Sequence, residues 1–421
     1  MASSQQTLAV WAADYRAGLL GRSPDQRQYV FAYDPNAELP GSQVSLTMPV
    51  RLESWLSQDL HPIFQMNIPE GALLEAIRRA IAKLVGNDEL AILRTTGGDQ
   101  IGRNRFSLPG DTSPGIVETH ESLEDLLSYP DTDELFNDLV AKYALRSGVS
   151  GVQPKVMLAA TERGTAAVGG YIVKSWGSDY PQLAANEFFC MTAVQLAGLP
   201  VPEFHLSENG GLFVMKRFDI AADASMIGFE DMCSLQAVGT AQKYGSTYER
   251  VARSIRDFVS PEFLREARAQ FFASLVLSCI LGNGDAHLKN FGVLYVNPGA
   301  PVRLAPVYDV VTTVSYIPRD VPALSLAGTK KWWSRKILEQ FAVAHLALSV
   351  REIALIFEKS AEAVANTRVM LLTYMEDHHE FREVGSRMLN AWETGLILYG
   401  TTLPIKKGGT TRRIILKTAV Q

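Results

Sequence analysis

Cysteine is scarce in this sequence, where only Cys190, Cys233 and Cys279 occur and no two form a C-x-x-C motif. An odd, scattered set excludes a disulfide framework and a zinc cage built on cysteine pairs. Long apolar runs are also missing, since the longest, residues 273–281, is about half of what a bilayer requires. The polar, uncharged start lacks the basic segment of a signal peptide. We therefore expect a cytoplasmic protein that makes no membrane contact.

The sequence also lacks a large excess of charge of one sign. It has 40 Lys and Arg and 45 Asp and Glu, which gives a net charge of −5. Such a chain is not expected to coat nucleic acid by bulk charge, although a local basic patch stays open. The composition is 47% hydrophobic and 20% charged, which excludes collagen-like, coiled-coil and disordered chains. A length of 421 residues predicts two or three domains, since one core rarely exceeds about 250–300 residues.

Residues 1–143 are predicted to form a small subdomain of strands and linker helices. Short apolar runs at residues 7–11, 28–33 and 44–46 predict strands, with turn clusters at residues 18–21 and 34–41. Apolar residues at helical spacing predict a helix over 71–84, and a second helix is expected over 122–144. The polar stretch between them, residues 95–119, predicts loop and linker.

The rest of the chain is predicted to form a second sheet and then a helical lobe. Within residues 144–238 we expect strands at 156–160, 169–173 and 212–217, and a helix at 183–196 whose start is marked by Pro181 and whose end by Gly198. Residues 239–421 are mainly helical, with the clearest helix running from Ser260-Pro261-Glu262 to Gly282. The expected fold class is α+β, a strand-rich N-terminal part followed by an all-helical lobe.

The segment after that long helix, Asn-Gly-Asp-Ala-His-Leu-Lys-Asn at residues 283–290, carries the first chemical signal. Asn-Gly indicates a turn, so Asp285 is expected on a loop between rigid neighbours. Asp285 and Asn290 have the D-x-x-x-x-N spacing of the protein-kinase catalytic loop, where the Asp accepts the proton of the attacking hydroxyl and the Asn oxygen holds magnesium. The alternative is a helix-capping Asp and a turn Asn.

Asp309 lies in the apolar segment 304–311, which predicts a short strand. A carboxylate there is costly to bury unless it is paired or bound to a metal. Mg²⁺ prefers one or two carboxylates together with substrate phosphates, and Asp309 and Asn290 would supply such a set. The alternative is an Asp that caps the next turn.

Lys174 closes the apolar strand at residues 170–174, a setting in which kinases place the lysine that neutralises the α- and β-phosphates. Glu187 lies among Ala and Phe in the helix that follows, and an acid buried there needs a cation such as Lys174. The alternative is a strand-end Lys and a solvated helix Glu.

Two weaker signals surround these residues. The Gly- and Ser-containing turn at residues 145–155 could lay backbone N–H groups over phosphates, or be an ordinary hairpin turn. The connector at residues 213–219 could pair its backbone with an adenine edge and pack Phe218 on the ring, or be a plain edge strand. Because all these signals follow one another in kinase order, we expect Lys174, Asp285, Asn290 and Asp309 to meet around a single triphosphate.

Two further residues of this loop carry side chains that can take part in the chemistry. His287 could be a base or a metal ligand, but with no second histidine nearby in sequence a role in bracing the loop is favoured. Lys289 is expected to neutralise the transferring phosphoryl group.

Taken together, these segments resemble the HipA family, the serine/threonine-kinase toxins of bacterial HipBA toxin–antitoxin modules. The matching segments are Ser150-Gly151-Val152-Gln153-Pro154-Lys155, Ala185-Asn186-Glu187, Lys216-Arg217-Phe218-Asp219, Glu230-Asp231-Met232-Cys233, residues 282–291 and residues 304–309. The early strands are similar to the small N-terminal subdomain of full-length members.

The resemblance implies a bilobal protein-kinase-like fold and ATP- and Mg²⁺-dependent phosphorylation of a protein serine or threonine, with aminoacyl-tRNA synthetases as target type. It implies a HipB-like DNA-binding antitoxin as partner, through which operator DNA is mainly contacted. It makes Asp285 the catalytic base, Asn290 and Asp309 magnesium ligands, Lys174 a phosphate contact, and Lys216 and Phe218 adenine contacts through their backbone. The nucleotide-binding candidates are in full Val149, Ser150, Gly151, Val152, Gln153, Lys155, Lys174, Glu187, Lys216, Phe218, His287 and Lys289.

Family members also autophosphorylate a serine of the Gly-rich loop, which expels the loop and switches activity off. Ser150 is favoured because it lies inside the Gly-rich turn, with Ser147 as second choice. The physics agrees, because a dianion beside ATP phosphates repels both the nucleotide and its metal.

Two other functions compete with a protein kinase toxin: a kinase of a small-molecule alcohol, and a nucleotide-binding co-repressor scaffold without catalysis. The tail, residues 404–421, carries five positive charges, Lys406, Lys407, Arg412, Arg413 and Lys417, and no acid. It could touch DNA phosphates beside a DNA-binding partner, although a solvated terminal segment is favoured.

Overall fold

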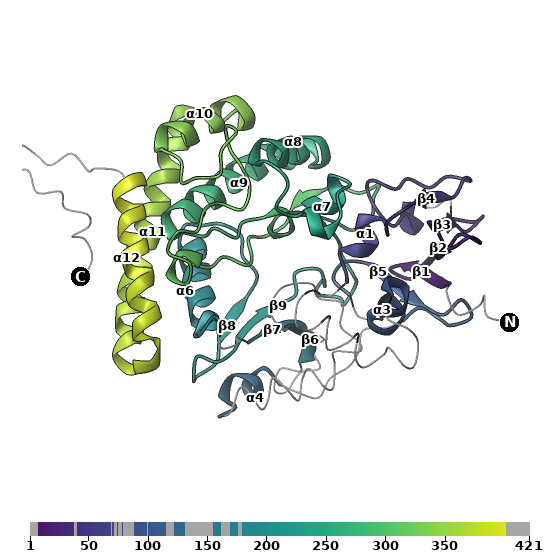
Figure 1. The fold of residues 1–421 in the computed structure, drawn as a ribbon, viewed down its shortest axis with the longest axis horizontal. Helices are drawn as coiled ribbons and strands as arrows, with labels where there is room; N and C mark the ends of the chain where they lie inside the picture. Colours follow the sequence, from purple (N-terminus) through teal and green to yellow (C-terminus); the bar gives the residue numbers. More distant parts are fainter. Residues whose placement is uncertain are drawn as a thin grey trace, which may run out of the picture.

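The computed structural model describes residues 7–37, 40–68, 70, 74, 78, 88–98, 100–114, 122–130, 155–160, 169–175 and 179–400, and for residues 155–160 and 169 the backbone alone. A small sheet unit at the N-terminal end, a second sheet and a helical lobe follow one another across the molecule (Figure 1). The predicted α+β class, strand-rich first and helical last, is confirmed.

The N-terminal unit is built on an antiparallel sheet with the strand order β4-β3-β2-β1-β5. Its elements are β1 (Leu8–Ala12), β2 (Tyr15–Arg22), β3 (Tyr29–Tyr33), η2 (Pro40–Ser42), β4 (Trp55–Ser57), α1 (Pro62–Gln65), α3 (Glu89–Thr96) and β5 (Asn104–Ser107). The next helix, α4 (Leu123–Ser128), lies away from this sheet (Figure 1), and its Leu127 carbonyl accepts a hydrogen bond from the Glu208 N–H. The buried ring of Phe64 packs edge-on against Phe31 and Phe106, with centroids 5.3 and 5.8 Å away. The buried side chains of these strands and of the helices beside them thus give the unit a core of its own.

The predicted turn at residues 18–21 is wrong, because these residues lie inside β2. A Cβ on Gly18 would come 2.1 Å from the carbonyl oxygen of Ala32 on the neighbouring strand. The pairing with β1 also skips Ala17, since Val10 faces Gly18 and Trp11 faces Arg16. The glycine therefore serves a bulge and a close strand approach instead of a turn.

Three other predictions for residues 1–143 need correction. Residues 44–46 form no strand but only an isolated bridge from Ser45 to Met48, because Ser45 and Leu46 bind Glu230 instead. The expected loop at 95–119 contains β5. The helix expected over 122–144 is α4, which ends at Ser128 two residues before Pro130, while residues 131–144 lie outside the described part. Most of the predicted helix over 71–84 also lies outside it, although Leu74 and Arg78 are helical.

The second sheet is antiparallel and has the order β6-β7-β9-β8, with α6 (Leu183–Leu196) packed on β8 and β9 (Figure 1). Its strands are β6 (Lys155–Ala160), β7 (Gly169–Lys174), β8 (Phe204–Leu206) and β9 (Phe213–Lys216). The bounds of α6 agree with the prediction, but Pro181 is not its first residue. Gln182 is the N-cap, in the left-handed conformation at φ 59°.

The C-terminal lobe contains α7 (Met232–Leu235), η4 (Thr240–Gln242), α8 (Tyr248–Phe258), α9 (Pro261–Leu281), η5 (Leu288–Asn290), η6 (Thr313–Ser315), α10 (Arg335–Leu346), α11 (Val350–Asp377), η7 (His379–Phe381) and α12 (Arg382–Tyr399). A small sheet, β10 (Gly228–Asp231), β11 (Gly292–Tyr295) and β12 (Arg303–Leu304), accompanies them. α9 starts at Pro261 after the N-cap Ser260, as predicted, and ends at Gly282 with φ 70°. Buried residues of α9 form the centre of the lobe, against α11 and α12. Among the described helices none is long and apolar enough to cross a membrane.

The N-terminal unit is docked on β10 and β11 through a buried acid, Glu230. One carboxylate oxygen accepts hydrogen bonds from the Leu46 N–H and the Tyr295 hydroxyl, both at 2.7 Å. The other accepts from the hydroxyls of Ser45 at 2.7 Å and Ser234 at 2.8 Å. Burial raises the pKa of Glu230, and the four donors oppose that shift. The acid thereby joins the two parts of the chain without a cation.

Glu230→Ala is expected to destabilise the protein by about 2–4 kcal/mol, because four buried donors lose their acceptor together. Glu230→Gln is expected to cost clearly less, since the Ser45 and Ser234 hydroxyls can turn and accept from the new amide. Urea unfolding of both variants measures the difference. Equal loss in the two variants would contradict this account.

Candidate active site

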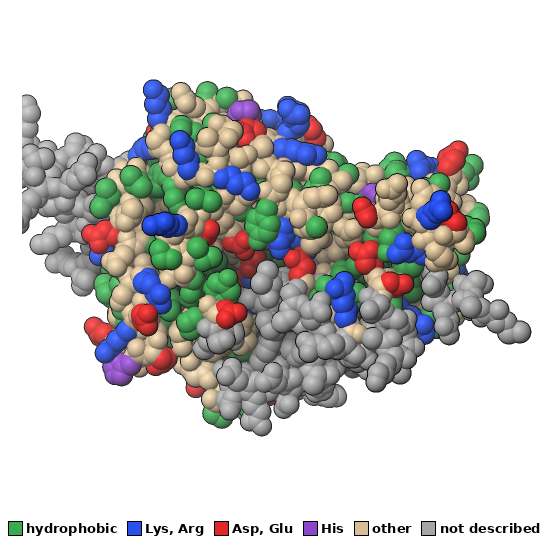
Figure 2. Space-filling view, in the orientation of Figure 1, with side chains coloured by type: hydrophobic (Ala, Val, Ile, Leu, Met, Phe, Trp, Pro, Cys, Tyr) green, Lys and Arg blue, Asp and Glu red, His purple; other side chains and the backbone are tan. Residues whose placement is uncertain are grey.

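A cavity of about 740 Å³ lies where the N-terminal unit, the second sheet and the C-terminal lobe meet. Figure 2 shows acidic and basic side chains lying side by side near the centre of the face that it opens on. The charged residues that line it are Glu70, Lys174, Asp179, Glu187, Asp231, Lys243, Asp285, Lys289, Asp309, Asp320 and Lys330. Of the four side chains expected to meet, it brings together Lys174, Asp285 and Asp309, and Asn290 reaches it by its hydrogen bond to Asp309.

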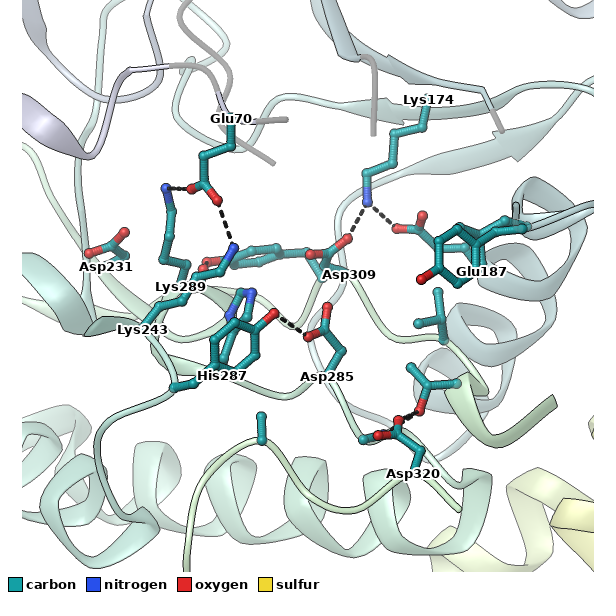
Figure 3. A pocket seen from close by; sticks show the side chains of 18 of the residues that line it. Glu70, Lys174, Glu187, Asp231, Lys243, Asp285, His287, Lys289, Asp309 and Asp320 are labelled. Carbon is teal, nitrogen blue, oxygen red and sulfur yellow. Dashed lines mark hydrogen bonds and ion pairs between the residues drawn. The ribbon is translucent and has the colours of Figure 1, made fainter. Parts of the chain in front are cut away.

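Lys174, at the end of β7, is the buried cation of the cavity. Its ammonium forms ion pairs with Glu187 of α6 and with Asp309, at 2.5 Å from the latter (Figure 3). Burial alone would lower the pKa of Lys174, but the charges of Asp309 and Glu187 outweigh it and raise the pKa. The side chains of Lys174 and Glu187 are only 4% and 2% exposed, so each buried charge needs the other as its partner. This is the pairing that the sequence predicts.

Asp309 does not lie on a strand, which corrects the prediction for residues 304–311. β12 ends at Leu304, and Asp309 has a left-handed backbone with φ 62°. A non-glycine residue stays in this conformation where its surroundings hold it. Here one carboxylate oxygen accepts from Lys174 and the other from the amide of Asn290 at 2.7 Å. The turn places the Asp309 carboxylate between Lys174 of the second sheet and Asn290 of the C-terminal lobe.

Asp285 lies on the loop between α9 and η5, as predicted. Its backbone N–H donates to the Asn283 side chain at 3.1 Å, and one carboxylate oxygen accepts from the Tyr244 hydroxyl at 2.9 Å. Burial, followed by the nearby charge of Asp309, raises the pKa of Asp285 to about 6. A carboxylate poised near neutral pH is what a general base requires.

His287 belongs to the same loop, and its side chain is buried. Its backbone N–H donates to the Asp285 carbonyl at 2.7 Å and to the Asn290 side-chain oxygen at 3.0 Å. Burial, with a smaller contribution from Lys243, lowers the pKa of His287 to about 3, so the ring is neutral. The ring packs edge-on against Tyr244 at 5.1 Å. These contacts suit a residue that braces the loop.

Lys289 and Lys243 converge on one acid from the N-terminal unit. Glu70 accepts from Lys289 at 2.6 Å and from Lys243 at 2.7 Å (Figure 3). Burial opposes ionisation of Glu70, but the two ammonium groups outweigh it and lower its pKa to about 2. The Glu70 carboxylate is therefore charged at neutral pH.

The other side of the cavity is apolar. Ile172 and Met215 of the second sheet line it, together with Phe218, Phe229 and Tyr308. The rings of Phe218 and Tyr308 lie 5.4 Å apart at 32°. A flat, mostly apolar wall beside a charged end can take a base and its phosphates.

Among the predicted nucleotide contacts, one described side chain does not line this cavity, and several others fall outside the described residues. The side chain of Lys216 pairs with Glu203 at 3.6 Å and does not line it, although Phe218 does. In the backbone of β6, Lys155 faces Lys174 of β7. Ser147, Val149, Ser150, Gly151, Val152 and Gln153 lie outside the described residues, as does the tail at 404–421.

Sequence reasoning missed Glu70, Lys243 and Tyr244 as parts of this cavity. Glu70 directly precedes the helix that the sequence predicts over 71–84, where an acid has an ordinary role. The adjacent cation and aromatic ring at residues 243–244 carry no spacing that singles them out. Their place depends on three segments that meet only in the folded chain.

The oxygen ligands and the cation beside the cavity fit a nucleotide with bound magnesium. Asp309 and Asn290 offer a carboxylate and an amide oxygen from adjoining segments, a set that Mg²⁺ completes with phosphates and water. Among the described residues, the Asn290 side-chain oxygen accepts one N–H bond, from His287, which leaves a lone pair for a metal. Lys174 supplies a cation for phosphates.

The chain is similar to known proteins over most of its length. The HipA N-terminal domain matches residues 8–107, and the HipA-like C-terminal domain matches residues 147–368. Two proteins of Sinorhizobium fredii are similar: Putative kinase Y4dM, 29% identical over 77% of this chain and 76% of its own, and Putative kinase Y4mE, 28% identical over 76% and 82%.

Among solved structures, HipA of Shewanella oneidensis, determined in complex with HipB and its operator DNA, superposes with a TM-score of 0.65. The match covers 93% of this chain and 98% of that chain at 18% sequence identity, and at that identity it shows a shared fold. The C-terminal domain match alone spans more than half of the 421 residues. With both domain matches and this fold in hand, the chain belongs to the HipA family.

Proposed function

We propose that the protein transfers the γ-phosphoryl group of Mg·ATP to a serine or threonine hydroxyl of another protein. The observation that carries the proposal is the convergence of Lys174, Asp285 and Asp309 on one cavity, with Asn290 hydrogen-bonded to Asp309. When bound, magnesium neutralises charge on the phosphates, and Asp309 and Asn290 are the residues that would hold it. The apolar wall with Phe218 would take the adenine.

In this proposal Asp285 orients the acceptor hydroxyl and takes its proton. In the structure the Tyr244 hydroxyl donates a hydrogen bond to the Asp285 carboxylate. The serine or threonine hydroxyl that receives the phosphoryl group would donate to Asp285 in the same way. Burial and the charge of Asp285 raise the pKa of Tyr244, so Tyr244 stays a donor. Tyr244 is 40% exposed at the cavity mouth, and an incoming hydroxyl can displace it.

We further propose that the kinase acts as the toxin of a toxin–antitoxin module. The supporting observations are membership of the HipA family and the fold shared with a HipA that was solved with HipB and operator DNA. A HipB-like DNA-binding antitoxin is the expected partner, with operator DNA contacted mainly through it. An aminoacyl-tRNA synthetase is the acceptor to test first.

The test is transfer of label from γ-labelled ATP, with magnesium, to purified aminoacyl-tRNA synthetases. The wild-type protein is expected to label an acceptor protein, and Asp309→Asn to lower the rate by about 10²-fold or more because the metal set loses its carboxylate. Label found only in small molecules would favour a small-molecule kinase. Binding of ATP without any turnover would favour a scaffold, and transfer undiminished by Asp309→Asn would refute the site.

Autophosphorylation is tested in the same reaction by mass spectrometry of the loop peptide. We expect phosphate on Ser150, its loss in Ser150→Ala, and its persistence in Ser147→Ala. Phosphate addition should also slow transfer to the acceptor, since a dianion in the loop repels the nucleotide phosphates. Phosphate retained in Ser150→Ala would assign the modification to another residue.

A further inference from the structure

One charged cluster in the cavity contains Lys289, which is expected to neutralise the transferring phosphoryl group, together with two residues, Glu70 and Lys243, that have no part in the transfer described so far. Glu70 comes from the N-terminal unit, whereas Lys243 follows η4 and Lys289 lies in η5 (Figure 3). The carboxylate of Glu70 gives one oxygen to each ammonium, Oε1 to Lys289 at 2.6 Å and Oε2 to Lys243 at 2.7 Å. One acid therefore holds two cations from separate segments.

The cluster is shielded from solvent, so its charges are weakly screened. The side chains of Lys243 and Lys289 are each 9% exposed, and that of Glu70 is 17% exposed. Two ammonium groups that share one carboxylate repel each other when the carboxylate loses its charge. Glu70 thus decides whether both lysines can remain where they are.

Movement of either lysine would also shift the loop that carries Asp285, because hydrogen bonds connect the lysine segments to that loop. The Leu288 N–H donates to the Lys243 carbonyl at 3.2 Å, so the two lysine segments are hydrogen-bonded to each other. The Lys289 carbonyl accepts from the Tyr308 hydroxyl at 2.6 Å, next to Asp309. Lys289 also directly precedes Asn290, whose amide donates to Asp309.

The N-terminal unit is fixed firmly enough to aim Glu70. The Gln65 side chain accepts from the Thr240 N–H at 3.1 Å, at the start of η4. Farther away, Asp219 accepts from the Gly102 N–H at 2.7 Å and also binds Arg217. Together with the Glu230 contacts, these bonds fix segments of the N-terminal unit that come before and after Glu70 in the sequence.

We propose that Glu70 is a positioning residue for phosphoryl transfer, through which the N-terminal unit holds Lys289, with Lys243 as a second cation, beside the loop of Asp285. This inference rests on the proposed kinase function. A lysine released from Glu70 has acids to move to, because a buried oxygen of Asp231 has no hydrogen-bond partner among the described residues and Asp285 senses the charge of Lys243. Either move would take a cation away from the phosphoryl group or tie up the base.

The main experiment is steady-state kinetics of Glu70→Gln in the full chain. The variant keeps the shape of the side chain, so we expect kcat to fall about 10-fold or more while KM for ATP changes less than about 3-fold, as for a group that acts in the transition state. Glu89→Gln is the matched control, because Glu89 binds the Tyr29 hydroxyl elsewhere in the N-terminal unit. An unchanged kcat in Glu70→Gln would overturn the proposal.

A second variant separates positioning from a general loss of structure. In Glu70→Gln/Lys243→Met, Lys289 no longer has a like charge beside it and can bind the amide oxygen. We expect the double variant to transfer phosphate faster than Glu70→Gln alone, which damage to the fold would not produce. A double variant that is no faster would overturn the charge-pairing argument.

Lysine acetylation gives a readout that does not depend on activity. Lys243 and Lys289 are expected to resist acetic anhydride in the wild type and in Glu89→Gln, and to react faster in Glu70→Gln, as measured by mass spectrometry of their peptides. Equal protection in Glu70→Gln would contradict the proposal. If the wild type transfers no phosphate, the proposed function fails, and this labelling still tests whether Glu70 holds the two lysines.

Discussion

Asp285→Asn is expected to lower kcat for phosphoryl transfer by about 10²–10⁴-fold, the range lost with a general base. Asparagine keeps the shape and can still accept the Tyr244 hydrogen bond, so binding of Mg·ATP should change little. Initial rates at saturating ATP, with calorimetric ATP binding alongside, measure the two effects separately. Asp179→Asn is the matched control, since Asp179 is an exposed acid lining the same cavity.

The pH dependence of the wild type follows from the same carboxylate. Burial and Asp309 raise the pKa of Asp285 to about 6, and only the deprotonated form can take a proton. kcat should therefore be level above about pH 7 and fall about tenfold per pH unit well below pH 6. This acidic limb should disappear in Asp285→Asn. A wild-type rate that stays level down to pH 5 would exclude Asp285 as the base.

The parts of the fold that the sequence predicts well are those with local causes. α6 and α9 each have a proline at or just before the start and a glycine just after the end, and their bounds agree with prediction. β2 was missed because Gly18 was interpreted as a turn residue, whereas its cause is the carbonyl of Ala32 on another strand. A glycine required by a distant backbone looks, in sequence, like a glycine required by a turn.

The same distinction applies to the site. The sequence correctly predicts the ion pair of Lys174 and Glu187. An acid among apolar residues is expected to be buried, and a buried acid needs a cation nearby. The left-handed turn at Asp309 and the reach of Glu70 to Lys243 have no local signature. They arise from three segments that come together only in the folded chain. The sequence alone predicts a strand at Asp309 and a helix directly after Glu70, and it gives Lys243 no role.

Lys174→Met is expected to have the second large effect, on both stability and activity. The side chain of Glu187 is 2% exposed, so removal of the ammonium leaves a buried carboxylate without its cation. We expect a loss of about 3–5 kcal/mol in the free energy of unfolding, as for a broken buried ion pair. Phosphoryl transfer should also be abolished, because the proposed phosphate contact is gone. Urea unfolding and label transfer measure the two losses.

The double variant Lys174→Met/Glu187→Gln separates these two roles. With neither charge present, most of the stability should return, because a neutral amide is much cheaper to bury than a carboxylate. Transfer should stay lost, since no cation is restored for the phosphates. Arg387→Met is the control for removing a cation from an exposed pair, where its i,i+4 partner Glu383 is 82% exposed and a change below about 1 kcal/mol is expected. Recovery of transfer together with stability would mean that Lys174 serves the fold and not the nucleotide.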